Sequence, residues 1–268
     1  MRTTLSTRLR NLLTAAFSVT LACCGVVASG QAAPPPPPLA STAEIVDQLV
    51  QHNEERADRL THYTAQRHYH LEYHGFPHSA DATMDVEALY DAPSKTFRVL
   101  SESGSQKLIN HVFKKLLTGE QEAAGEQSKN AMTPANYNFA LIETVYENGR
   151  YCFVLQVDPR TSSKFLFRGR IWVDAEDYAV AKVEAQPSET LSFWIRNTQI
   201  RHLYGKVGDF WLPQQNKTIT KVRLGGTAIL TIDFRKYEFE SASRQNQPPS
   251  ERAGLGMEFE DPQLLPFR

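Results

Sequence analysis

Residues 168–184 read Arg-Gly-Arg-Ile-Trp-Val-Asp-Ala-Glu-Asp-Tyr-Ala-Val-Ala-Lys-Val-Glu, and this stretch decides the fold class. It predicts a strand that ends at Asp174, a turn at Ala175-Glu176-Asp177, and a second strand over 179–185. A connection this short joins neighbouring strands that run antiparallel. The stretch therefore predicts an antiparallel sheet.

The same reading extends along most of the chain. Residues 63 to 74 alternate between two faces: Tyr63, Ala65, Arg67, Tyr69, Leu71 and Tyr73 share one of them. Asn148-Gly149 marks a tight hairpin turn. The further predicted strands are 84–90, 96–100, 138–146, 150–157, 163–174, 191–204, 210–213, 218–224 and 227–239.

Two helices interrupt this pattern. Apolar residues recur at helical spacing from Ser41, a suitable cap, to about Thr61, and again from Gln106 to Thr118, where Gly119 is expected to stop the helix. The polar residues from Glu120 to Thr133 predict a mobile connection.

The N-terminus has the features of an export signal. Residues 1–30 combine early arginines with an apolar stretch from Leu12 to Val27. Two processing routes stay open: release after the small residues 28–30, or lipidation of Cys23. Residues 31–42 form a proline-rich spacer, 43–240 the folded domain, and 241–268 a loose tail. The predicted location is the periplasm, with membrane anchoring through a lipidated Cys23 as the second possibility.

Composition excludes several classes of protein. The 268 residues carry a net charge of −1; without the three arginines of the signal, 26 basic and 30 acidic residues give −4, which disfavours nucleic-acid binding. Cys152 is the only cysteine of the folded part, so no disulfide can form within it.

Catalytic motifs are missing from the sequence. It contains no serine in a glycine-bracketed elbow, no paired zinc histidines on a helix, and no phosphate-binding glycine loop. Cys152 lies inside a predicted strand and reads as a small core residue. We therefore expect no enzymatic activity and no cofactor.

Three histidines share one strand face. His68, His70 and His74, with Glu72 among them, are the weak candidates for a metal site, because alternate strand residues project side by side. The simpler interpretation is a polar face in contact with water, and we expect no metal.

An apolar cavity is the alternative to an ordinary core. Aromatic residues are frequent on the predicted strands, and residues 138–146 carry apolar side chains on both faces. Such a sheet can wrap around a helix or a ligand. Arg67, which points inward, either pairs with a loop carboxylate as part of the core or latches a helix over a cavity.

The 168–184 segment and the order helix, strands, helix, strands resemble the outer-membrane lipoprotein-sorting family, the LolA-like and LolB-like periplasmic carriers. Phe210-Trp211-Leu212-Pro213 and the strand pair over 217–234 fit the same pattern. The resemblance implies an α+β fold: a curved antiparallel incomplete β-barrel, or half-barrel, with helices lidding the concave face. It implies a cavity for acyl chains, and the expected lining is Arg67, Tyr69, Leu71, Val86, Phe97, Val99, Phe113, Phe165, Phe167, Ile171, Trp172 and Trp194.

Two functions remain open at this point. The leading hypothesis is a monomeric carrier or chaperone that shelters the acyl chains of lipids or lipoproteins and exchanges them with membrane-bound donor or acceptor proteins. The alternative is an envelope sensor or protein-interaction module on the same fold.

Overall fold

The computed structural model describes residues 34–76, 78–125, 131–163, 165–189, 195–223 and 225–239. The predicted signal with Cys23, the predicted tail and Trp194 lie outside these residues. Among the residues described, no helix is both long enough and apolar enough to cross a membrane.

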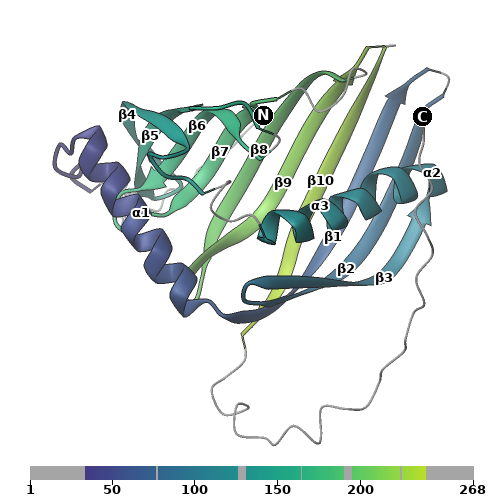
Figure 1. Ribbon diagram of the computed structural model, residues 1–268, viewed down its shortest axis with the longest axis horizontal. Helices are drawn as coiled ribbons and strands as arrows, with labels where there is room; N and C mark the ends of the chain where they lie inside the picture. Colours follow the sequence, from purple (N-terminus) through teal and green to yellow (C-terminus); the bar gives the residue numbers. More distant parts are fainter. Residues whose placement is uncertain are drawn as a thin grey trace, which may run out of the picture. The chain divides into compact units, whose positions relative to one another are not determined.

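Ten antiparallel strands form one sheet in the order β3-β2-β1-β10-β9-β8-β7-β6-β5-β4. The sheet is curved and open (Figure 1). Its edges are β3 and β4, which follow each other among the strands in sequence but are separated in space by the whole sheet. The bounds are β1 His62–Gly75, β2 Ala80–Asp91, β3 Ser94–Gly104, β4 Tyr137–Glu147, β5 Arg150–Pro159, β6 Phe167–Asp174, β7 Val180–Pro187, β8 Ile195–Val207, β9 Phe210–Val222 and β10 Gly226–Glu238.

Helix α1 (Thr42–Arg59) precedes the sheet and begins with a capping box. Ser41 Oγ accepts from the Glu44 N–H at 3.3 Å, and Glu44 Oε2 accepts from the Ser41 N–H at 2.7 Å. These two bonds satisfy backbone groups that a helix start leaves unpaired. Charged residues near both ends, Glu44 first and Arg56 and Arg59 last, also complement the helix dipole.

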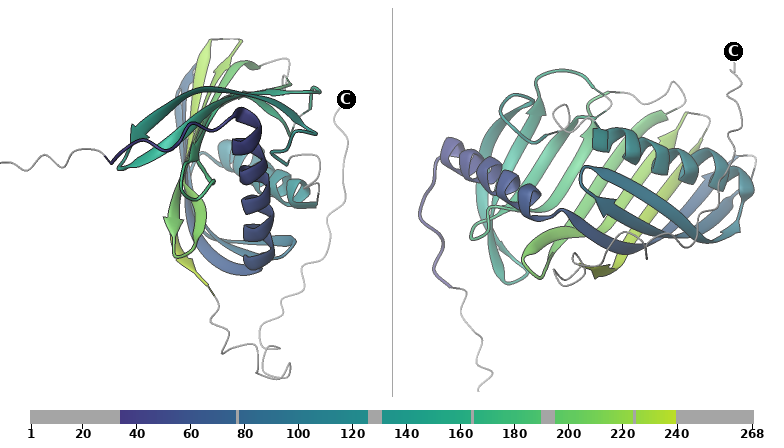
Figure 2. Two further views of the ribbon diagram at one scale, coloured as in Figure 1. Left: turned by 90° about the vertical axis from the view of Figure 1, so that its left-hand side faces the viewer. Right: turned by 60° about the horizontal axis from the view of Figure 1, so that its bottom comes forward.

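The second helical segment runs without a break through α2 (Gln106–Leu108), a π-helical turn η1 (Ile109–Phe113) and α3 (Lys114–Gly125). It forms the connection from edge strand β3 toward edge strand β4. Both helices lie on the same, concave, face of the sheet (Figures 1 and 2).

Two clusters of buried residues lie beneath the two helices, and a small third cluster consists of Cys152, Val154 and Trp172. One packs Ile45, Val46 and Leu49 of α1 against strands β4 to β7. The other packs Ile109, Phe113 and Leu117 against β1 and β2, with β10 at its margin. Strands β8 and β9 lie between these two covered halves (Figure 1).

The predicted fold class is confirmed as an open, curved antiparallel sheet with helices on the concave face. Several predicted boundaries are wrong: β2, for example, begins at Ala80, and β3 ends at Gly104. The second helical segment does not stop at Gly119 but continues to Gly125, the end of α3. A Cβ at Gly119 would meet no atom within 4 Å. The strands expected at 210–213 and 218–224 are one strand, β9, and the strand expected from Ser163 begins at Phe167.

Candidate functional site

The concave groove lies beside α1, over strands β7 to β9. Its volume is about 260 Å³. Helix α1 contributes one wall, and the sheet contributes the floor. Its lining residues are Asn53, Arg56, Met132, Phe167, Ala179, Val180, Val183, Ile200, His202, Tyr204 and Trp211.

Strand alternation explains this lining. Ile200 and His202 on β8 face the groove, while Gln199 and Arg201, which flank Ile200 in sequence, are exposed on the opposite face. His202 is paired in register with Val183 of β7 and with Asn216 of β9. The groove floor therefore follows the period-two pattern across neighbouring strands.

The two titratable groups on the floor are uncharged at neutral pH. Burial lowers the pKa of His202 from 6.5 to about 4 and raises the pKa of Tyr204 from 10.0 to about 12, because an apolar setting disfavours both charged forms. The floor of the groove therefore carries no net charge between these values.

Asn216 brings an unused acceptor to the same region. Its Oδ1 is buried and has no hydrogen-bond partner among the residues that the structure describes. A buried amide oxygen without a partner is costly unless a donor reaches it. An N–H or O–H group of a bound molecule could supply that donor.

Arg56 fastens α1 beside the groove. Its guanidinium donates to the backbone oxygens of Asp177 and Tyr178 at 2.9 and 3.0 Å, and to Asn53 Oδ1 at 2.7 Å. Asp177 is held in turn by hydrogen bonds from Lys206 and the Trp211 indole. Although partial burial raises the pKa of Asp177, these bonds lower it on balance.

On the other half of the concave face, Arg67 joins the sheet to α3. Its Nη1 lies 2.7 Å from Glu120 Oε2, and Lys95 Nζ of β3 lies 2.9 Å from Glu120 Oε1. The Arg67 guanidinium also lies over the rings of Phe97 and Phe234, at 5.2 and 4.9 Å from their centroids. Such stacking adds favourable cation–π contact.

Arg67, Lys95 and Glu120 are close enough for their charges to shift pKa values within the group. Burial raises the pKa of Glu120, but the cations of Arg67 and Lys95 lower it overall. Burial lowers the pKa of Arg67, but Glu120 raises it overall. The inward arginine thus pairs with a carboxylate on the helix, in a segment where the sequence predicted a mobile connection.

We call the part of the concave face under η1 and α3, over β1 and β2, the α3 half. The structure brings together the predicted lining residues that lie there. Tyr69, Leu71, Val86 and Phe113 form one buried cluster with Phe97 packed against it. Tyr69 and Phe113 meet edge to face, with centroids 5.7 Å apart. A ligand would reach these side chains only after α3 moves.

The other predicted lining residues are dispersed. Phe167 lines the groove and Ile171 is buried under α1, but Trp172 faces the convex side, where Lys182 Nζ lies 3.8 Å from its ring centroid. Val99 is 41% exposed on edge strand β3. Phe165 lies in the loop before β6.

Sequence reasoning missed the middle of the groove. Ile200 and His202 lie in a strand that was predicted, and the alternation Gln199-Ile200-Arg201-His202 was a usable signal. Asn216 carried no such signal, because its position depends on the pairing of β9 with both neighbours.

The predicted metal candidates have protein partners. His68 Nδ1 lies 2.8 Å from Asp85 Oδ1, and Glu72 lies 3.7 Å from His70 and 3.5 Å from His74. Within the described part of the chain, no group of three or more His, Cys, Asp or Glu side chains is arranged to hold a metal ion.

Cys152 and Asp174 have structural surroundings. Burial raises the pKa of the Cys152 thiol to about 11, which keeps it protonated and poorly nucleophilic. Asp174 accepts from the backbone N–H groups of Glu176 and Asp177 and from the Arg150 guanidinium. It therefore holds the β6–β7 turn that the sequence predicted.

Comparison with known proteins gives one family and several structures. A family model described as a family of unknown function, DUF5686, matches residues 128–236. No curated protein matches the sequence.

Similar solved structures include a domain described as an outer membrane lipoprotein-sorting protein from Vibrio parahaemolyticus, at 12% identity, 74% coverage of this chain, 94% of that chain and a TM-score of 0.39. A DUF1329 family protein from Desulfovibrio piger has 11% identity, coverages of 76% and 95%, and a TM-score of 0.36. A LolA superfamily protein from Nitrosomonas europaea has 11% identity, coverages of 80% and 100%, and a TM-score of 0.32. The descriptions of the first and third structures name the lipoprotein-sorting and LolA proteins that the 168–184 segment resembles.

Proposed function

We propose that this protein binds the acyl chains of a lipid or lipoprotein on the concave face of its sheet and shelters them from water. The observation that carries the proposal is the groove over β7 to β9, whose floor of Val183, Ile200 and the neutral His202 and Tyr204 carries no charge, while the one cation of its described lining, Arg56, lies on the α1 wall. Burial of apolar surface in such a site contributes about 0.8 kcal/mol per methylene.

The size of the groove sets the expected mechanism. Its 260 Å³ lies just below the lower end of the range of roughly 300 to 1,000 Å³ for small-molecule sites. A long acyl chain would therefore displace α1 or α3 from the sheet, and the cost of that displacement would offset part of the binding free energy.

Asn216 supports a polar group near the acyl chain. Its unpaired Oδ1 faces the same side of the sheet as His202. An amide N–H or hydroxyl beside the chain would satisfy it, which favours an acylated amide or a lipid with a free hydroxyl.

Export to the envelope and a monomeric state are part of this proposal. The signal-like N-terminus, with its early arginines and apolar stretch, supports the export. The proposal includes no catalytic step, and it gives no nucleophilic role to the Cys152 thiol, whose pKa burial raises to about 11.

The test pairs two isoleucines on opposite faces of the sheet. Ile200→Glu places a charge in the groove, while Ile219→Glu places the same charge on the convex face of the neighbouring strand, and both side chains are partly buried. Titration with a fluorescent fatty acid should show binding that Ile200→Glu weakens about tenfold or more and that Ile219→Glu leaves intact.

Native mass spectrometry of protein purified without detergent gives the cargo class. Bound acyl-chain masses would support the proposal. Lipid-free protein that takes up no fatty-acid probe, or equal losses in both variants, would contradict it.

A second candidate function rests on the open sheet edges. Strand β3 exposes Val99 and Leu100 at 41% and 45%, and β4 exposes Ile142 at 49%. An extended segment of a partner protein could add a strand at such an edge. A pull-down from envelope extract that β3 proline substitutions abolish, with lipid binding unchanged, would favour this function.

A further inference from the structure

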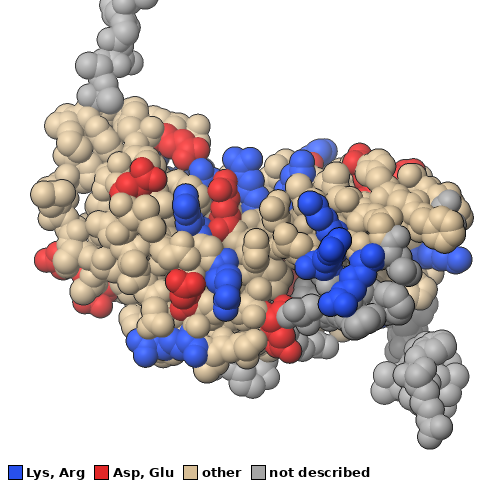
Figure 3. All heavy atoms as spheres, turned by 90° about the horizontal axis from the view of Figure 1, so that it is seen from above, with Lys and Arg blue, Asp and Glu red and all other residues tan. Residues whose placement is uncertain are grey.

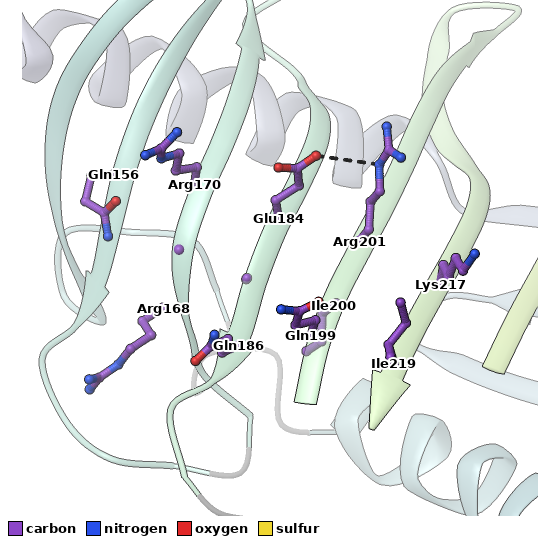
Figure 4. Close-up of a pocket in the computed structure, with 12 residues that line it drawn as sticks. Gln156, Arg168, Arg170, Glu184, Gln186, Gln199, Ile200, Arg201, Lys217 and Ile219 are labelled. Atoms are coloured by element: carbon purple, nitrogen blue, oxygen red, sulfur yellow. Dashed lines mark ion pairs between the residues drawn. The ribbon is translucent and has the colours of Figure 1, made fainter. Parts of the chain in front are cut away.

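A second hollow lies on the convex face of the sheet, behind the concave groove. It has a volume of about 660 Å³ and spans the neighbouring strands β5 to β9 (Figure 4). Its polar lining comes from every second residue of these strands. The residues between them point to the opposite face, where the helices lie. The side chains that matter here are Gln156, Arg168, Arg170, Glu184, Arg201 and Lys217.

Positive charge exceeds negative charge in this hollow. Four cationic side chains (Arg168, Arg170, Arg201 and Lys217) line it with one carboxylate, Glu184, so the net charge is three positive. Glu184 Oε1 lies 3.6 Å from Arg201 Nε and 4.0 Å from Lys182 Nζ.

The remaining cations are available to a ligand. Among the residues that the structure describes, Arg168, Arg170 and Lys217 make no ion pair with a carboxylate, and all three are exposed. Figure 3 shows a face on which basic and acidic side chains are interleaved. An excess of cations with free guanidinium groups therefore distinguishes this hollow from a mixed surface.

Gly169 sets the arginine pair in place. It has a φ of 152°, and a Cβ there would lie 2.3 Å from the carbonyl oxygen of Glu184 and 2.6 Å from the Cα of Ala185. Only glycine allows β6 and β7 to approach this closely. Arg168 and Arg170, the neighbours of Gly169 in sequence, lie on the same face because alternate strand residues project to the same side (Figure 4).

The register forms a continuous row of polar groups. Gln156, Arg170, Glu184, Arg201 and Lys217 are paired in succession across β5 to β9. Arg168 is paired with Gln186 in the adjacent row. Adjacent strands lie about 4.8 Å apart, so the row can contact a ligand of several groups and not only a single ion.

We propose that this hollow binds a phosphate group carried on a polyol or sugar. The planar fork of a guanidinium matches two phosphate oxygens, and two arginines with a lysine, none of them ion-paired within the described residues, supply cationic partners for a phosphate. The glutamine carboxamides both donate and accept, as hydroxyl groups require. The volume of the hollow lies well within the range of roughly 300 to 1,000 Å³ for small-molecule sites.

Two sources carry this chemistry: a soluble phosphorylated polyol, and the headgroup of a phospholipid such as phosphatidylglycerol. Calorimetric titration with inositol hexakisphosphate, with uncharged myo-inositol as the control ligand, tests the first. Sedimentation with phosphatidylcholine vesicles, with and without phosphatidylglycerol, tests the second. Binding in either assay should weaken as salt is raised.

The variants use matched arginine pairs. R168Q/R170Q removes the unpaired arginines of the hollow, and R98Q/R235Q removes two exposed strand arginines elsewhere, 70% and 62% exposed. The first variant should weaken binding about tenfold or more, because hydrogen bonds to charged groups are lost, and the second should not. R168K/R170K keeps the charge without the fork and should fall between them.

Glu184→Gln removes the one carboxylate among the described lining residues of the hollow and should strengthen binding by about twofold to fivefold. Binding to inositol hexakisphosphate with these effects supports the site, and binding only to phosphatidylglycerol vesicles with the same effects supports it with a lipid as the source. No binding in either assay, or equal loss in both arginine pairs, would overturn the proposal. The outcome of the inositol hexakisphosphate assay and the outcome of the vesicle assay do not depend on acyl-chain binding in the groove.

Discussion

The two halves of the concave face are covered in different ways. Over β4 to β7, α1 buries Ile45, Val46 and Leu49, and its main polar contacts run from Arg56 to backbone oxygens. Over β1 and β2, the second helix buries Ile109, Phe113 and Leu117 and adds an ion pair between Glu120 and Arg67. Backbone oxygens do not titrate, whereas Glu120 does. Acid therefore acts directly on the Arg67–Glu120 ion pair of the α3 half, whereas the hydrogen bonds of Arg56 keep their acceptors.

The largest expected effects come from the apolar contacts of each half. Phe113→Ala should lower the free energy of unfolding by about 3 to 5 kcal/mol and Leu49→Ala by about 2 to 5 kcal/mol, since both side chains are fully buried. Urea unfolding measures both. If either substitution cost less than 1 kcal/mol, the helix concerned would not cover a packed core.

His202, between the two halves, gives the next effect. Its pKa falls from 6.5 to about 4 on folding, so the unfolded chain binds the proton more readily between these values. The free energy of unfolding should therefore fall as the pH drops from 6.5 to 4, by up to about 3 kcal/mol.

His202→Leu should flatten this part of the pH profile, measured by urea unfolding at several pH values. An unchanged profile in the variant would show that His202 is not desolvated in the groove.

The ion pair of the α3 half gives a smaller effect. Arg67→Met should lower the free energy of unfolding by about 1.5 to 3 kcal/mol, the range for hydrogen bonds to charged groups, because Glu120 keeps Lys95 and is one-third exposed. Arg56→Met is the matched substitution for α1, because it also removes a guanidinium that joins a helix to the rest of the fold.

Acid should separate these two variants. The pKa of Glu120 is lower in the folded protein than its ordinary 4.5, so its ionised form stabilises the fold above pH 4.5 and that contribution is lost as the pH falls below 4.5. The Arg67 and Lys95 partners stay charged throughout. Arg67→Met should thus remove part of the acid sensitivity below pH 4.5, and Arg56→Met should leave it; the reverse pattern would invalidate the comparison.

Most elements of the fold were predictable because their patterns are local. The alternation from Tyr63 to Tyr73 and the helical spacing after Ser41 appear in the structure as β1 and α1. The β9 error arose at Pro213, which lies at a register shift opposite Tyr204. A bulge tolerates the missing N–H, so the strand continues through the proline.

The candidate site was less predictable because it depends on contacts between distant segments. The helix extension past Gly119 is accompanied by the pairing of Glu120 with Arg67, 53 residues away. Ile171 and Trp172 could have been separated by alternation alone, since neighbours on a strand face opposite sides. Asn216 and Ile200 share a face only through the pairing of β8 with β9.

Quenching of Trp211 by a brominated fatty acid tests the central claim most directly. Trp211 lines the groove and also a second hollow that Trp172 shares, so a quencher in the groove reaches Trp211 alone and a quencher in the shared hollow reaches both. Trp194 is the third tryptophan of the chain. In a W172F/W194F variant, the remaining Trp211 fluorescence should be quenched saturably by the fatty acid. In W194F/W211F, where Trp172 remains, quenching should be weak; equal quenching in both variants, or none in the first, would contradict acyl-chain binding in the concave groove.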